Sequence, residues 1–125
     1  MANAVLRGTC LRGVDMSGAQ LDRVVLTRAD LRKGNLRGAG FRGALLDEAD
    51  LRDARLGSAF LVRASLRGAD SRGAYLRLAK LDGADLSDAN LEGAEGLTQA
   101  QLDRARRNAG TRLPDGLTGV ENAER

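Results

Sequence analysis

The residues of this chain that could do chemistry are acidic and basic side chains recurring at intervals of twenty. They are Asp30, Asp50 and Asp70, together with the arginines Arg12, Arg32, Arg52 and Arg72. Grouped carboxylates can bind a metal ion or act as an acid–base pair. Alternatively, each carboxylate points outward, is solvated and bonds to the local backbone. We favour the second interpretation.

The remaining composition offers little for catalysis. The 125 residues contain no histidine and one cysteine, Cys10, so there is no imidazole base and no second thiol for a disulfide or metal site. We therefore expect a non-enzymatic protein with no catalytic residue, no metal and no cofactor. The sequence shows neither a signal-peptide pattern nor an apolar run of membrane-spanning length, which favours the cytoplasm. Arginine outnumbers lysine eighteen to two, which suggests a GC-rich bacterial source.

A five-residue repeat carries these side chains without insertion from Ala4 to Gly93. Its plainest copies read Ala-Asp-Leu or Ala-Asn-Leu, followed by two variable residues. The centre is Leu in fifteen of eighteen copies, and the residue two before it is Ala in fourteen. The three exceptional centres are Met16, Phe41 and Ser71.

A period of five fits neither an amphipathic helix nor a regular strand. The gap of two from Ala to Leu predicts a short extended segment with both side chains inward. The gap of three to the next Ala predicts a corner, and half of the corner positions are glycine. Segments and corners in alternation make a coil, and stacked coils make a solenoid.

The A-(D/N)-L-x-x phrase resembles the pentapeptide-repeat family over about three quarters of the chain. The resemblance implies an all-β solenoid, a right-handed quadrilateral β-helix with four repeats per coil. Eighteen repeats then give about four and a half coils.

The repeat frame fails at residues 94–96, and the sequence that follows predicts a helix. Thr98 and Gln101 can form a capping box, with Leu97 and Leu102 as its hydrophobic staple. We expect a helix from Gln99 to Ala109 that covers the open edge of the last coil. The expected organisation is a β-helix over 1–95, a C-terminal α-helical cap and turn over 96–117, and a flexible tail over 118–125.

With four repeats per coil, residues twenty apart stack in outward columns. One column is apolar, and we expect it to contact a protein partner or a second copy in a homodimer. Its residues are Val5, Val25 and Leu45, with Phe60 and Val62 around the adjoining corner. Tyr75 and Leu78 form a smaller outlying pair. Other outward arginines are Arg7, Arg37, Arg42, Arg67 and Arg77.

The Asp and Arg columns lie side by side and have two interpretations. They form a ladder whose charges compensate each other, or Arg12, Arg32, Arg52 and Arg72 form an anion-facing column. Nucleic acid is a weak candidate partner for such a column, because no aromatic stacking platform accompanies the arginines.

The resemblance adds a third function class. The best-known members of the family are acidic, dimeric mimics of duplex DNA that occupy DNA gyrase and protect it from quinolones. The net charge here is +3, which disfavours mimicry of DNA. We rank a scaffold for protein interaction first, modulation of gyrase or topoisomerase second, and binding of nucleic acid or another anionic surface third.

Overall fold

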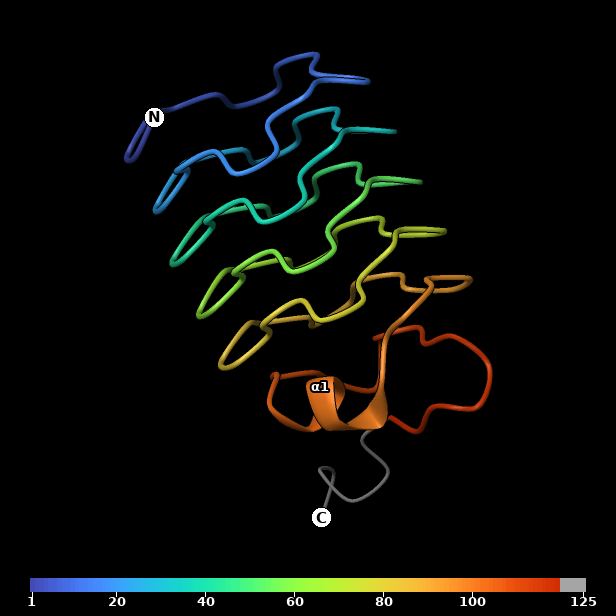
Figure 1. Cartoon of the computed structure of the whole chain (residues 1–125). Helices are drawn as coiled ribbons and strands as arrows, with labels where there is room; N and C mark the ends of the chain where they lie inside the picture. Colours follow the sequence, from blue (N-terminus) through green and yellow to red (C-terminus); the bar gives the residue numbers. More distant parts are fainter. Residues whose placement is uncertain (120–125) are drawn as a thin grey trace.

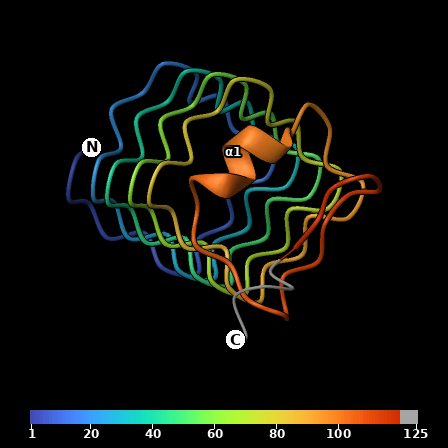
Figure 2. The same cartoon turned by 90° about the horizontal axis from the view of Figure 1, so that it is seen from below.

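In the computed structural model, which describes residues 1–119, the chain winds into a four-sided coil (Figures 1 and 2). Parallel bridges join residues twenty apart, from Val5–Val25 through to Tyr75–Glu95. One coil therefore takes four pentapeptides. Residue 1 lies at one end of the stack, and the segment after residue 95 lies at the other (Figure 1).

Every repeat turns through the same hydrogen bond. In one example the Ala29 N–H donates to the carbonyl of Leu26 at 2.9 Å. The residue before the donor is left-handed, as at Arg28 with φ of 62°. This combination defines a type II turn. Glycine stands at half of these corner positions, and the nine non-glycine residues at the other corners of the repeats adopt the same left-handed backbone.

Neighbouring coils are joined by three backbone hydrogen bonds per face, one of which runs from the turn residue, as from the N–H of Arg28 to Asp47 O at 3.0 Å. The N–H of Leu26 donates to Leu45 O at 2.7 Å, and the N–H of Leu45 donates to Val24 O at 2.9 Å. Because the chain turns again after each pair, residues 1–119 contain isolated bridges and no longer strand.

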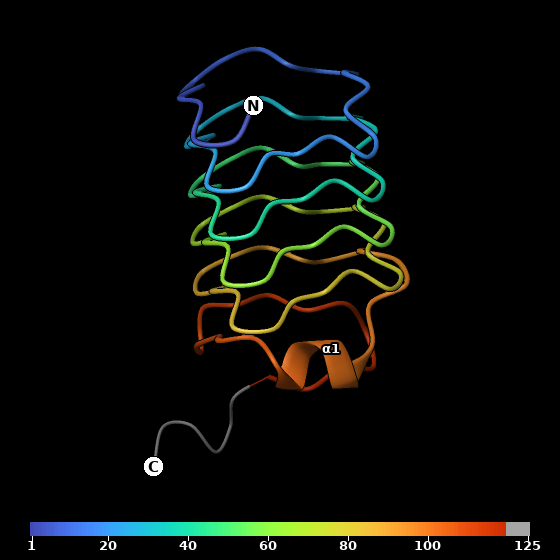
Figure 3. The ribbon, with the colours of Figure 1, turned by 60° about the vertical axis from the view of Figure 1, so that its left-hand side comes forward.

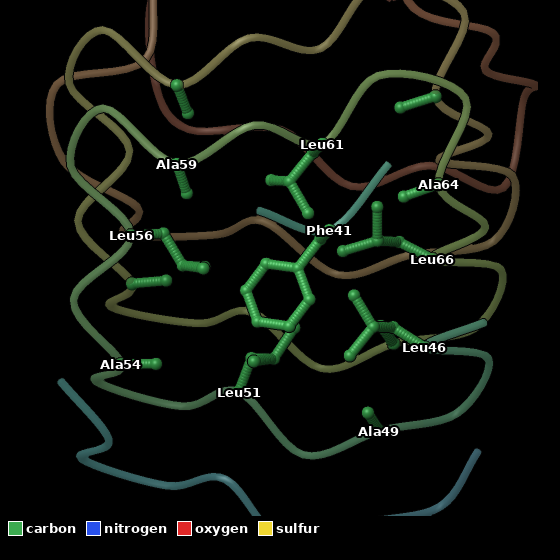
Figure 4. Close-up of a cluster of buried hydrophobic side chains, with 14 of the residues drawn as sticks. Phe41, Leu46, Ala49, Leu51, Ala54, Leu56, Ala59, Leu61, Ala64 and Leu66 are labelled. Carbon is green, nitrogen blue, oxygen red and sulfur yellow. The ribbon is translucent and has the colours of Figure 1, made fainter. Parts of the chain in front are cut away.

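The core is a stack of Leu and Ala layers (Figure 4). Every repeat centre from Leu21 to Leu91 is buried, which confirms the inward assignment. The polar centre Ser71 is buried too, with 2% of its surface exposed. The first-coil centres Leu6, Leu11 and Met16 are only half-buried, because a neighbouring coil covers them on one side alone.

The C-terminal helix, α1, spans Gln99–Asp103 and lies across the end of the coil (Figures 2 and 3). The expected extension of this helix to Ala109 is wrong. Instead the chain returns to the open edge: Arg106 N–H donates to Ala84 O at 2.7 Å, and Arg112 N–H donates to Ala89 O at 2.9 Å. Pairing with that edge satisfies backbone groups of both partners, which further helical turns would leave open.

From residue 120 onward, the tail expected over 118–125 lies outside the described residues. Among residues 1–119, no helix has the length and apolar character needed to cross a bilayer.

Candidate interaction surfaces

The apolar column lies on the first face, whose repeat centres are Leu6, Leu26 and Leu46. Parallel bridges stack Val5 on Val25 and Val25 on Leu45. Val5 is 62% exposed and Leu45 is 42% exposed, while Val25 between them is half-buried. The structure therefore brings the three residues together on the surface, in the order expected from the sequence.

The two apolar residues at the adjoining corner have a polar neighbour. Phe60 and Val62 are both half-buried. The Arg42 guanidinium lies over the Phe60 ring, with Cζ 5.3 Å from the centroid, which is within the range of a cation–π contact. The corner is therefore less apolar than the sequence suggested, because Arg42 covers part of the ring.

The next face carries the Asp–Arg ladder, which consists of Asp30, Asp50 and Asp70 with Arg32, Arg52 and Arg72. Arg32 Nε donates to Asp30 Oδ1 at 2.9 Å, and its Nη2 donates to Oδ2 at 2.7 Å. The other two pairs repeat this fork with distances of 2.6 to 2.9 Å. The same aspartate also accepts the backbone N–H of its arginine at 3.2 Å.

Contacts between coils join the pairs into one network. Arg32 Nε lies 3.6 Å from Asp50 Oδ2, and Arg52 Nε lies 3.7 Å from Asp70 Oδ2. Arg32, Arg52 and Arg72 each use Nε and Nη2 on an aspartate, so an anion at these arginines competes with a carboxylate that is already bound. Arg12 differs, because Cys10 occupies the position that aspartate has in the next three coils, and Arg12 is exposed.

The arginines shift the acidity of the ladder. Hydrogen bonding from Arg32 holds the pKa of Asp30 at about 2, below its ordinary value of 3.8. Hydrogen bonds from Arg52 and Arg72 lower the pKa of Asp50 and of Asp70, although burial acts in the opposite direction. The carboxylates are ionised at neutral pH and are occupied by arginine. Within residues 1–119, no three acidic or cysteine side chains gather to hold a metal ion.

The predicted cap residues meet at the C-terminal end of the coil. Thr98 and Gln101 form a reciprocal capping box at the start of α1, and Leu102 is fully buried. The Gln101 amide also donates to Leu76 O and Ala79 O, at 2.9 Å each. Tyr75 beside Leu76 still has a bridge to Glu95, whereas Lys80 after Ala79 has no bridge to a later coil within the described residues. The Gln101 side chain thus bonds carbonyls at the point where pairing with the next coil ends.

A third surface, on the face centred on Leu36, Leu56 and Leu76, was not recognised as a unit from the sequence. Arg37, Ser58, Tyr75, Arg77 and Leu78 surround a hollow of about 370 Å³ above Gly57, which we call the basic hollow. The signal in the sequence was Gly57, which stands between Arg37 and Arg77 in their twenty-residue column.

A coil of short repeats stacked by parallel bridges defines a β-helix repeat protein. The family model for pentapeptide repeats matches residues 1–38, 26–61, 59–95 and 72–106, in eight copies. The chain belongs to the pentapeptide-repeat family, whose members adopt a right-handed β-helix. The comparison with curated proteins found no match.

Solved structures agree with this assignment. Rfr23, a pentapeptide repeat protein from the cyanobacterium Cyanothece 51142, superposes with a TM-score of 0.71 at 24% identity, covering 87% of this chain and 90% of that chain. HetL from the cyanobacterium Nostoc sp. strain PCC 7120, involved in heterocyst differentiation regulation, gives 0.67 at 30% identity, covering 90% of this chain but only 61% of HetL.

A trypsin-treated form of QnrB1, a plasmid-mediated fluoroquinolone resistance protein, gives a TM-score of 0.50 at 18% identity. The match covers 91% of this chain and 82% of that chain. At this identity the likeness shows the fold alone.

Proposed function

We propose that the protein is a non-enzymatic scaffold that contacts a protein surface, including a second copy of itself, through the apolar column. The observation that carries this proposal is the bridged stack of Val5, Val25 and Leu45 with its outer members in water. Burying such a side chain contributes about 1 to 2 kcal/mol. No requirement of the core explains the stack, because all three side chains point away from it.

The surroundings of the column fit an interface. Phe60 and Arg42 lie at its corner in contact with each other, and aromatic residues and arginine are enriched at protein–protein interfaces. The backbone beneath the column is fixed by hydrogen bonds between coils, so little ordering is needed when a partner binds.

The other two function classes have less support. A DNA mimic needs a continuous negative surface, whereas the Asp–Arg ladder pairs each of its carboxylates with a guanidinium. The same pairing occupies three of the four arginines of the anion-facing column. Gyrase modulation would therefore need a surface other than the ladder.

The proposal also divides the chain by role. We assign residues 1–95 to the binding body and residues 96–117 to a cap that protects the last coil. Gln101 and the buried Leu102 support the cap assignment. The exposed, free thiol of Cys10 fits a reducing compartment, and on that basis we propose the cytoplasm.

Sedimentation velocity over a range of concentrations tests the proposal for self-contact. We expect the wild type to associate as concentration rises and the variant Val25→Asp with Leu45→Asp to remain monomeric. The matched control is Ser17→Asp with Gln20→Asp, which places the same two charges at exposed positions of the first coil that do not belong to the apolar column. Identical profiles for the wild type and the Val25/Leu45 variant would remove the column as a self-association surface.

A further inference from the structure

The face that carries the basic hollow, centred on Leu36, Leu56 and Leu76, lies two faces along the coil from the face of the apolar column. In a coil with four sides, which Figure 2 shows end-on, these two faces are opposite each other. Arg37 and Arg77 occupy the same outward column two coils apart, a distance of about 9.6 Å. Gly57 stands between them and leaves the space of one side chain open. A Cβ at Gly57 would lie 3.3 Å from Cε2 of Tyr75, so the tyrosine ring occupies part of that space.

The arginines of the hollow have unused charge. Within residues 1–119, Arg37, Arg55 and Arg77 form no ion pair, in contrast to the ladder arginines. Arg55 lines an adjoining hollow of about 340 Å³ together with Arg37, Tyr75 and two carboxylates, Asp53 and Glu95. In the described part of the chain, no carboxylate lines the basic hollow itself, which lies above Gly57. An incoming anion therefore meets free guanidinium groups beside an aromatic ring.

Leu78, which lines the basic hollow, has an unusual backbone conformation. It is 65% exposed and has φ of 63°, a left-handed conformation that a leucine adopts only at a cost in free energy. At the other left-handed turns among residues 1–119, the residue is glycine or a polar side chain. Exposure and strain both oppose folding at this position, and strained residues of this kind gather at functional sites.

A groove continues from the hollow. Arg77 and Leu78 also line a second space of about 410 Å³ together with Leu81 and Ala100, and the charged residues Lys80, Asp82 and Arg104 line it too. A ligand that reaches from the arginines toward α1 would thus meet the apolar side chains of Leu78, Leu81 and Ala100.

We propose that the basic hollow and this groove bind an acidic, extended polypeptide segment that carries an apolar side chain. Carboxylates of the segment pair with Arg37 and Arg77 on either side of Tyr75, and the apolar side chain packs on Leu78. Arginine and tyrosine are the residue types most often dominant in protein interfaces. Single-stranded nucleic acid fits this site less well. Proteins that bind single strands stack successive bases on several aromatic rings, whereas Tyr75 is the one aromatic residue that lines the basic hollow. The inference rests on the proposed interaction role but concerns a different surface.

Tyr75 provides the measurement, because it is the chain's single tyrosine and the chain has no tryptophan. A peptide of five glutamates and one leucine is titrated while tyrosine fluorescence is followed, with a peptide of five lysines and one leucine for comparison. We expect saturable binding of the glutamate peptide alone, and weaker binding as salt rises. Arg37→Gln with Arg77→Gln should weaken it about tenfold or more. Arg7→Gln with Arg63→Gln, two exposed arginines elsewhere, should leave it unchanged.

Leu78→Gly separates function from folding. Because glycine adopts the left-handed turn without strain, we expect a higher melting temperature together with weaker peptide binding. Unchanged peptide affinity in this variant would refute the apolar contact.

The acidic-segment proposal is overturned if the glutamate peptide does not bind, if the Arg37/Arg77 variant binds it equally well, or if a thymidine hexamer binds more tightly. Repeating the titration on Val25→Asp with Leu45→Asp distinguishes this site from the apolar column. If this variant still binds the glutamate peptide, the proposal for the basic hollow is supported even if the proposal for the apolar column fails.

Discussion

At the scale of single residues, an aspartate followed two positions later by an arginine forms a local ion pair. In the ladder, both the arginine side chain and its own backbone N–H bond to the same carboxylate, as Arg32 does to Asp30. The recurrence of Asp and Arg at twenty-residue intervals was visible in the sequence. The fork itself was not, because it depends on side-chain rotamers that the sequence does not specify.

The ladder predicts a pH dependence. Because the pKa of Asp30 is lowered in the folded state, its contribution to stability is present above about 3.8 and is lost as pH falls toward about 2. The melting temperature of the wild type should fall across this window, and Asp30→Asn should reduce that fall. Melts of the two proteins at matched ionic strength make the comparison. An equal fall in both proteins would show that the Asp30–Arg32 pair does not contribute.

A second prediction concerns Ser71, the polar residue in the column of centres that includes Leu51 and Leu91. Its inward position is confirmed by its burial, and its column neighbours are both buried leucines. Serine fills less volume than leucine, so Ser71→Leu should restore the column and raise the free energy of unfolding by about 1 to 2 kcal/mol. Urea denaturation of both proteins measures the change. A lower midpoint for Ser71→Leu would mean that the site is already filled.

At the scale of elements, the repeat was predictable and the C-terminal segment only in part. The two–three spacing of apolar residues specified which side chains face inward, and the buried row from Leu21 to Leu91 follows it. The capping box of α1 was also predictable, since Thr98 and Gln101 are local in sequence. The end of the helix at Asp103 was not, because helix propensity over 104–109 is overridden by pairing of Arg106 with the last regular coil.

Gln101 gives the prediction at this scale. Gln101→Ala removes two hydrogen bonds to the carbonyls of Leu76 and Ala79 as well as one arm of the capping box. We expect a loss of about 1 to 3 kcal/mol in the free energy of unfolding. Gln20→Ala is the control, since Gln20 is exposed on the first coil. Equal stability of the two variants, measured by urea denaturation, would contradict the role of Gln101 in covering the open end.

At the scale of the whole molecule, the four faces differ in chemistry. One carries the apolar column, the next carries the compensated ladder, and the one opposite the apolar column carries the basic hollow. The first two could be anticipated by reading residues twenty apart. The hollow could not, because it depends on how the Tyr75 ring leans across Gly57, a residue eighteen positions earlier in the neighbouring coil.

A scaffold in the literal sense holds two partners at once, and opposite faces of a rigid rod allow this. Sedimentation velocity of the wild type with a fluorescently labelled peptide of five glutamates and one leucine tests it directly. The label should move with the self-associated species, because the apolar column and the basic hollow share no residue. A label that moves only with monomer, or a wild type that the peptide dissociates, would contradict a scaffold with two independent surfaces.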